Sequence, residues 1–97
     1  MEKQQMKKFL KEIAKPVKNE LFSEVGYSEE ELKLMKYLYI DKINQDWVSD
    51  ELGISIPTLT KWHNNCIAQM INFFNYHKFK LQNNENNSFN KYFEGKL

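Results

Sequence analysis

One stripe of apolar and aromatic side chains constrains the fold of this chain more than any other feature. It recurs at intervals of three and four residues, through Leu59, Trp62, Cys66, Met70, Phe73 and His77. This spacing places the side chains on one face of an α-helix, and Ile67, Ile71 and Phe74 widen that face. The pattern predicts a long helix, with Ser55 as its cap and Pro57 in its first turn.

The rest of the chain carries helical signals as well. Three glycines and two prolines among 97 residues leave few positions for turns, which favours helices over a fold of many strands. The apolar spacing predicts a first helix from Lys3 to Lys15. Pro16 marks either a break or a fresh start, and a short second helix is predicted to end near Gly26.

Two further helices are predicted from their capping residues. Ser28 followed by Glu31 is a capping-box pattern, and the helix after it is expected to end near residues 41–42. The apolar face of this helix consists of Leu32, Met35, Leu38 and Tyr39. Asn44 is a good N-cap for a short helix over residues 45–52.

Composition excludes several classes of protein. Apolar residues make up 41% of the chain and suffice for one small domain, which we place at residues 1–82. Residues 83–97 are predicted to be an Asn-rich linker and a C-terminal stub. A single cysteine forms no internal disulfide, the N-terminal segment is polar, and no apolar stretch is long enough to span a bilayer. These features predict a cytoplasmic protein without membrane attachment.

Charge is unevenly distributed, although the formal net charge is only +1. Residues 1–18 hold six lysines and two glutamates, residues 19–54 three lysines and nine acidic residues, and residues 55–97 five lysines and two glutamates. The basic ends fit nucleic-acid binding, or lysines that only solvate helix faces. The absence of arginine also fits an AT-rich coding sequence.

Residues 45–62 hold the most informative pattern. The small residue Ser49 and the turn residue Gly53 are spaced so that two helices can meet at a steep angle. The apolar positions that would join these helices are Val48, Leu52, Ile54, Leu59 and Trp62. This segment resembles the helix-turn-helix of phage and bacterial transcription factors.

The resemblance extends over residues 27–70, which are similar to the sigma-factor region-four type, in which a preceding helix buttresses the motif. At the last small and apolar core positions of that type, this sequence has Cys66, Ile67, Ala68 and Met70. The Thr-Leu-Thr-Lys-Trp run also resembles terminase small subunits and transposases. The resemblance implies an all-α domain with a helix-turn-helix and a long C-terminal recognition helix. It further implies a sequence-specific transcriptional regulator of phage or mobile-element type that binds double-stranded DNA.

By the same resemblance, the residues that enter the major groove are Ser55, Ile56, Pro57, Thr58, Thr60, Lys61 and Asn64. The two threonines offer hydroxyls to base edges or phosphates, and Ile56 and Pro57 suit a thymine methyl group. Lys61 suits guanine acceptors or a phosphate, and Asn64 suits adenine. A solvated helix face is the alternative role for each of them.

Two features argue against tight DNA binding by a monomer. Acidic residues, Asp46, Asp50 and Glu51, lie on the helix that would approach the phosphate backbone. Between residues 55 and 75 the chain has one charged residue, Lys61. Few phosphate contacts mean weak binding, so we expect a homodimer or the lysines near the N-terminus to supply charge. These lysines are Lys3, Lys7, Lys8, Lys11, Lys15 and Lys18.

Aromatic residues near the end of the long helix are too many for one face of a lone helix. They are Phe73, Phe74, Tyr76 and Phe79. Either the first helix folds back over them or two chains pair there, and we expect both an intrachain core and a homodimer.

Two alternative functions stay open. A protein-binding adaptor or inhibitor would use an acidic helical face to meet a basic partner, and RNA polymerase is an example of a protein partner. The acidic residues concerned are Glu24, Glu29, Glu30, Asp46, Asp50 and Glu51. A DNA-recognition subunit of a packaging or transposition complex is suggested by the resemblance alone.

The sequence predicts neither catalysis nor a cofactor. His63 and Cys66 are spaced like a pair of metal ligands on one helix, but only His77 could join them, and zinc needs four ligands as a rule. Cys66 is expected in the core, where cysteine behaves as a small apolar residue. A Cys–His nucleophile is disfavoured because both residues share one helix without an evident pocket. We therefore expect no metal site and no enzyme.

Overall fold

The computed structural model describes the backbone of residues 2–81 and the side chains of residues 2–77, and within these bounds the chain is helical without strands. The helices are α1 (Lys3–Glu12), α2 (Lys15–Val25), α3 (Glu29–Met35), the π-helical η1 (Lys36–Ile40), α4 (Gln45–Leu52) and α5 (Ile56–Leu81). A small all-α domain is therefore confirmed. The predicted linker and stub lie outside the described residues, and the domain boundary at residue 82 stays a prediction.

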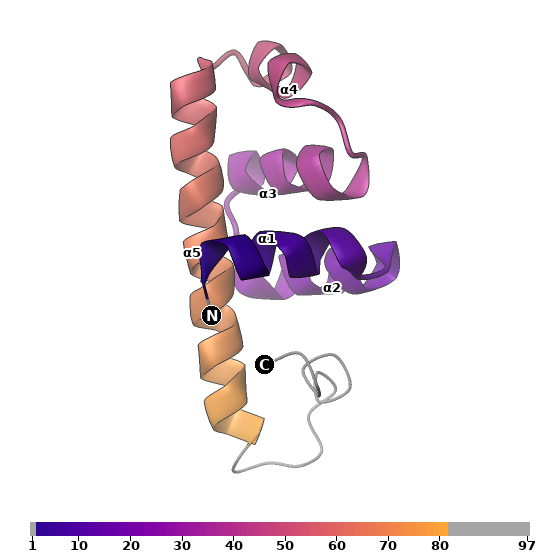
Figure 1. Ribbon diagram of the computed structural model, residues 1–97, viewed down its shortest axis with the longest axis vertical. Helices are drawn as coiled ribbons and strands as arrows, with labels where there is room; N and C mark the ends of the chain where they lie inside the picture. Colours follow the sequence, from indigo (N-terminus) through magenta and orange to yellow (C-terminus); the bar gives the residue numbers. More distant parts are fainter. Residues whose placement is uncertain (1, 82–97) are drawn as a thin grey trace.

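The long helix α5 is the axis of the domain. It forms one rod, across which α1, α2 and α3 all lie, while α4 packs near its N-terminal end (Figure 1). The α1 helix folds back over the aromatic part of α5, where the rings of Phe9 and Phe74 meet edge to face with centroids 5.3 Å apart. Intrachain packing thus covers part of the aromatic zone, and pairing of two chains stays a prediction.

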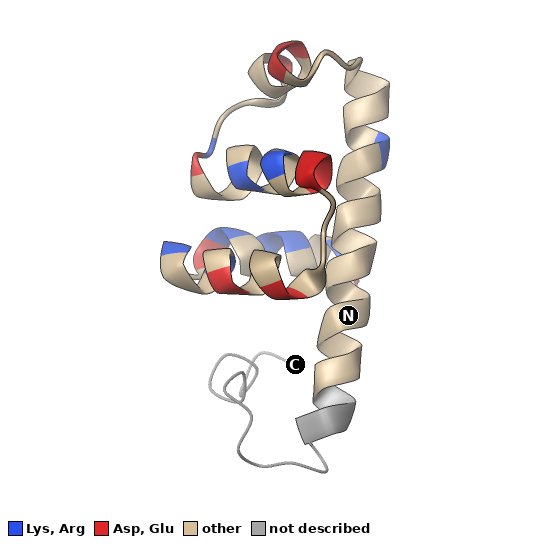
Figure 2. Cartoon of the chain, turned by 180° about the vertical axis from the view of Figure 1, so that it is seen from behind, with Lys and Arg blue, Asp and Glu red and all other residues tan. Residues whose placement is uncertain are grey.

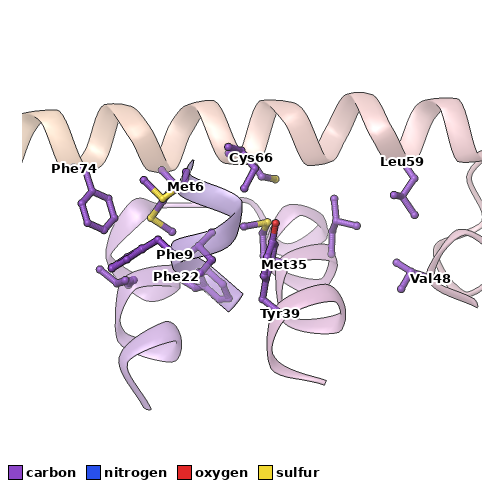
Figure 3. Packing of buried hydrophobic residues seen from close by; sticks show 14 residues of the cluster. Met6, Phe9, Phe22, Met35, Tyr39, Val48, Leu59, Cys66 and Phe74 are labelled. Carbon is purple, nitrogen blue, oxygen red and sulfur yellow. The ribbon is translucent and has the colours of Figure 1, made fainter. Parts of the chain in front are cut away.

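The core lies between α5 and the shorter helices (Figure 3). Its buried side chains are Met6, Phe9, Leu10, Leu21, Phe22, Leu34, Met35, Tyr39, Val48, Leu59, Cys66, Ile67, Met70 and Phe74. Within the predicted stripe of α5, Leu59, Cys66 and Met70 are buried. Trp62 and Phe73 are only half-buried and pack against the core from its border, because the shorter helices cover α5 from one side.

Capping residues begin the third and fourth helices as predicted. The backbone N–H of Glu31 donates to Oγ of Ser28 (3.3 Å), and the backbone N–H of Ser28 donates to the Glu31 carboxylate (2.9 Å). At the start of α4, Oδ1 of Asn44 accepts from the backbone N–H of Trp47 at 2.9 Å. Both starts therefore depend on residues three positions apart, which is why the sequence could show them.

The boundary between the first two helices differs from the prediction. α1 ends at Glu12 rather than at Lys15, and α2 begins at Lys15 with Pro16 in its first turn. Proline lacks the backbone N–H that a helix interior needs and a first turn does not, so Pro16 starts the second helix. Gly26 ends α2 in a left-handed conformation with φ of 85°.

The last turn of the third helix is wound more loosely than predicted. In η1 the backbone N–H of Asp41 bonds to the carbonyl five residues earlier, at 2.9 Å. Tyr39 is the buried residue of this π-turn, and Leu34 and Met35 are buried just before it. The predicted apolar face is confirmed at Met35 and Tyr39, which are buried, while Leu32 and Leu38 are half-buried and pack against the core from its border. Leu34 is also buried, which the predicted face did not include.

Lys18 is buried, with 1% of its surface exposed, so it does not join the lysines expected to face nucleic acid. Its Nζ donates to the carbonyl oxygen of Tyr39 at 2.8 Å. This bond caps the C-terminal end of η1, where the helix dipole favours a cation. Burial lowers the pKa of Lys18, and the charges of Lys42 and Lys15 lower it further.

Candidate nucleic-acid interface

A short connection turns the chain from α4 into α5. Gly53 has φ of 68°, a left-handed conformation that residues with a Cβ resist. The backbone N–H groups of Gly53 and Ile54 donate back to the carbonyls of Asp50 (3.2 Å) and Ser49 (3.0 Å), which is the Schellman arrangement. The hydroxyl of Ser49 also donates to the carbonyl of Ile54. These bonds hold the turn that the sequence predicted at Gly53.

The apolar side chains predicted to join the two helices lie at this corner. Val48 and Leu59 are fully buried and point toward one another (Figure 3). Leu52, Ile54 and Trp62 are half-buried and pack against the same core. Because α4 packs on the inner side of the first turns of α5, the outer side of those turns stays exposed.

The structure leaves most of the predicted DNA-reading residues accessible. Exposed are Ser55, Ile56, Pro57, Thr60 and Lys61, and half-buried are Thr58 and Asn64. Ser55 and Thr58 use their hydroxyls in the cap of α5. Oγ of Ser55 accepts from the backbone N–H of Thr58 (3.3 Å) and donates to Oγ1 of Thr58 (3.0 Å). The first role of this pair is therefore to begin the helix.

Asn64 lies where α1 meets α5. Nζ of Lys7 donates to Oδ1 of Asn64 at 3.5 Å, which is a long hydrogen bond. Helical spacing places Pro57, Thr60, Lys61 and Asn64 on one side of α5, and we call these four residues the reading strip. The strip therefore ends beside a lysine of α1, a contact between residues 57 positions apart that sequence spacing could not show.

Acidic and basic residues are unevenly spread over the helices: the charged residues of α4 are all acidic, whereas α1 has four lysines against one glutamate. From behind, acidic residues run along α2, and basic residues run along α1 on its far side (Figure 2). On α1, Lys3, Lys8 and Lys11 are exposed and Lys7 is half-buried. The acidic residues predicted to form one face are all exposed, namely Glu24, Glu29, Glu30, Asp46, Asp50 and Glu51. They fall into two groups, one on α2 and α3 and the other on α4.

The candidate metal and nucleophile residues have structural roles. Nε2 of His63 lies 2.7 Å from the hydroxyl of Tyr39, and burial lowers the pKa of His63 to about 4, helped by the charges of Lys7 and Lys11. Cys66 lies in the core as predicted, and burial raises the pKa of its thiol to about 12. Within residues 2–81, no three His, Cys, Asp or Glu side chains come together in a way that could hold a metal ion.

Comparison with known proteins does not assign the chain to a family. No protein-family model, no curated protein and no solved structure matches the chain. The resemblance to helix-turn-helix proteins therefore rests on the residues themselves and stays a prediction. In the part of the chain that the structure describes, no helix combines the length and apolar character needed to cross a membrane.

Proposed function

We propose that this protein binds double-stranded DNA as a helix-turn-helix protein and regulates transcription, with the first turns of α5 in the major groove. The observation that carries this proposal is the exposed start of α5 directly after the Gly53 turn. The major groove admits an α-helix, and residues near the N-terminal end of that helix reach base edges. The role is one of binding rather than of catalysis.

The exposed side chains offer distinct contacts to base edges. Ile56 and Pro57 present apolar surface to a thymine methyl group, and Thr60 presents a hydroxyl. Lys61 brings an ammonium group for guanine acceptors or for a phosphate. Asn64 can pair with adenine once its carbonyl oxygen releases Lys7, and their hydrogen bond of 3.5 Å is long and therefore weak.

Fluorescence anisotropy with duplex DNA at several salt concentrations tests this proposal. Lys61→Ala is expected to weaken binding and, where Lys61 contacts a phosphate, to lower the salt slope by about one. Thr60→Ala is expected to relax sequence preference by about 1–3 kcal/mol at the base pair it contacts. Lys33→Ala is the matched control, because it removes the same charge from an exposed position of α3. Absence of salt-sensitive binding at low salt contradicts the proposal.

A second candidate function is protein binding through α4. Trp47 is 44% exposed, although its ring packs edge-on against Tyr37 with centroids 5.3 Å apart. Asp46, Asp50 and Glu51 are exposed on the same short helix. Exposed tryptophan is a frequent anchor in protein interfaces, and the three acids would favour a basic partner.

Affinity capture from a nuclease-treated lysate separates the two functions. A protein partner that the wild type retains and Trp47→Ala loses supports the second function. Capture of DNA alone, lost on nuclease treatment and unaffected by Trp47→Ala, contradicts it.

A further inference from the structure

A hollow of about 340 Å³ opens between α1, the end of η1 and the start of α4. Its walls are Lys11, Leu38, Tyr39, Lys42, Ile43 and Asn44. Two of these residues are lysines and none is acidic, and the lysines come from segments that are distant in sequence. Asp41 and Asp46, the acidic neighbours of the loop in sequence, are exposed and do not line the hollow. The fold thus gathers positive charge in a concave site.

The backbone beside this hollow is irregular in two ways. Lys42 has φ of 55°, and it is the one non-glycine residue with positive φ in the described part of the chain. A residue with a Cβ in this region costs about 1 kcal/mol or more, and such strain persists where the surrounding structure imposes it, often at binding sites. The π-turn η1 ends just before this loop, and π-turns are also frequent at functional sites.

A third lysine, Lys18, contacts a residue that lines the hollow. The buried ammonium group of Lys18 donates to the carbonyl of Tyr39, a residue that lines the hollow. The charge of Lys42 also lowers the pKa of Lys18. Like charges repel one another, and an anion in the hollow would offset the repulsion between Lys42 and Lys18. The lysine side chains, the concave surface and the positive φ of Lys42 therefore occur together at this hollow.

We propose that this hollow binds a phosphate group, held by the ammonium groups of Lys11 and Lys42 and by Nδ2 of Asn44, whose Oδ1 already caps α4. The source of the phosphate rests on the proposed function: it belongs to the DNA backbone beside the groove that α5 enters. Lys7 lies one helical turn before Lys11 and contacts Asn64. Lys7, which contacts the reading strip, and Lys11, which lines the hollow, thus lie on one side of α1, and the proposal places one sugar-phosphate strand beside them.

The test compares DNA affinity against salt concentration for Lys11→Gln and Lys42→Gln, with a mixed-sequence duplex of about two helical turns. Each variant is expected to bind roughly five- to ten-fold more weakly at about 0.1 M salt, with a salt slope lower by about one. Sequence preference is expected to stay unchanged, because phosphate contacts carry no sequence information. Lys33→Gln, an exposed lysine of α3 outside the hollow, is the matched control.

Lys42→Gly separates the charge of Lys42 from its part in the fold. Glycine adopts a positive φ without strain, so this variant is expected to unfold at a temperature no lower than that of the wild type. Weaker DNA binding by a fully folded Lys42→Gly protein supports the phosphate site. If Lys11→Gln, Lys42→Gln and Lys42→Gly all bind DNA with the affinity and the salt slope of the wild type, the phosphate site is overturned.

A failure of the proposed DNA binding can be distinguished from a failure of the phosphate site. If the wild type binds no duplex at low salt, DNA is not the source, and an NMR titration with inorganic phosphate then tests the hollow alone. Saturable amide shifts at residues 42–45 that disappear in Lys42→Gln assign the hollow to a free phosphoryl compound. Absence of these shifts as well as of DNA binding overturns the inference.

Discussion

The hydroxyl of Tyr39 lies 2.7 Å from Nε2 of His63, and this half-buried contact joins the π-turn η1 to the helix that carries the reading strip. Because the pKa of His63 is about 4, its ring is neutral at physiological pH and can accept a hydrogen bond from the hydroxyl. Tyr39 also lines the hollow that we propose as a phosphate site, and its carbonyl oxygen accepts a hydrogen bond from Nζ of Lys18. Tyr39 thus connects the core to α5 and to the hollow that Lys11 and Lys42 line.

The stability of the protein should depend on pH through His63. Its pKa is about 4 in the folded protein against an ordinary 6.5, so the unfolded chain binds more protons between these two values. The free energy of unfolding is therefore fully retained above pH 6.5 and falls as the pH drops toward 4, by up to about 2 kcal/mol after allowance for solvent screening. Denaturant titrations between pH 6.5 and 4 should show this fall in the free energy of unfolding, and His63→Gln should not show it. An equal slope in His63→Gln would contradict the assignment.

Gly53→Ala should cost about 1 kcal/mol in the free energy of unfolding. A Cβ at Gly53 meets nothing within 4 Å, so the cost comes from the positive φ alone. Gly53→Asn should cost less, because asparagine tolerates the left-handed region better than alanine. Chemical denaturation of the two variants measures the difference. Equal stability of Gly53→Ala and the wild type would show that the turn does not need this conformation.

Lys18→Met should lower the free energy of unfolding at neutral pH by about 1–3 kcal/mol, because the carbonyl of Tyr39 loses its buried donor. The pKa of Lys18 is lowered in the folded state, so the unfolded chain keeps this proton to higher pH. The free energy of unfolding of the wild type should therefore increase as the pH rises toward 10.5. Lys18→Met should not show this increase. Lys8→Met, at an exposed position of α1, should change stability by less than about 0.5 kcal/mol.

Phe9→Leu should cost about 1–2 kcal/mol, since it removes the edge-to-face contact with Phe74 and leaves space in the core. This contact holds α1 against α5, and α1 places Lys7 beside Asn64 and Lys11 at the hollow. DNA affinity should therefore fall in this variant while most of the protein is still folded by circular dichroism. The control is Tyr76→Leu. Tyr76 is 56% exposed, so this substitution should change the free energy of unfolding by less than about 0.5 kcal/mol. If Phe9→Leu lowers stability but leaves the DNA affinity unchanged, the lysines of α1 do not contact DNA.

Local chemistry was enough to predict the helix starts and the turn. Asn44, Ser55 and Gly53 act on backbone groups within five positions of themselves, so short-range spacing contains the whole interaction. The same holds for the exposed start of α5, where Thr60 and Lys61 lie opposite the buried Leu59 side by helical periodicity. The sequence by itself therefore determined the all-α class, the position of the turn and the outward strip of α5.

The tertiary structure decided which charges and apolar groups meet. The burial of Lys18, the contact of Lys7 with Asn64 and the pairing of Lys11 with Lys42 around one hollow all join residues far apart in the chain. The tertiary structure also decided that Leu34 is buried and that Leu32 and Leu38 lie at the border of the core. Such features depend on which helices touch and at what angle, and the spacing within one helix carries no information about its neighbours.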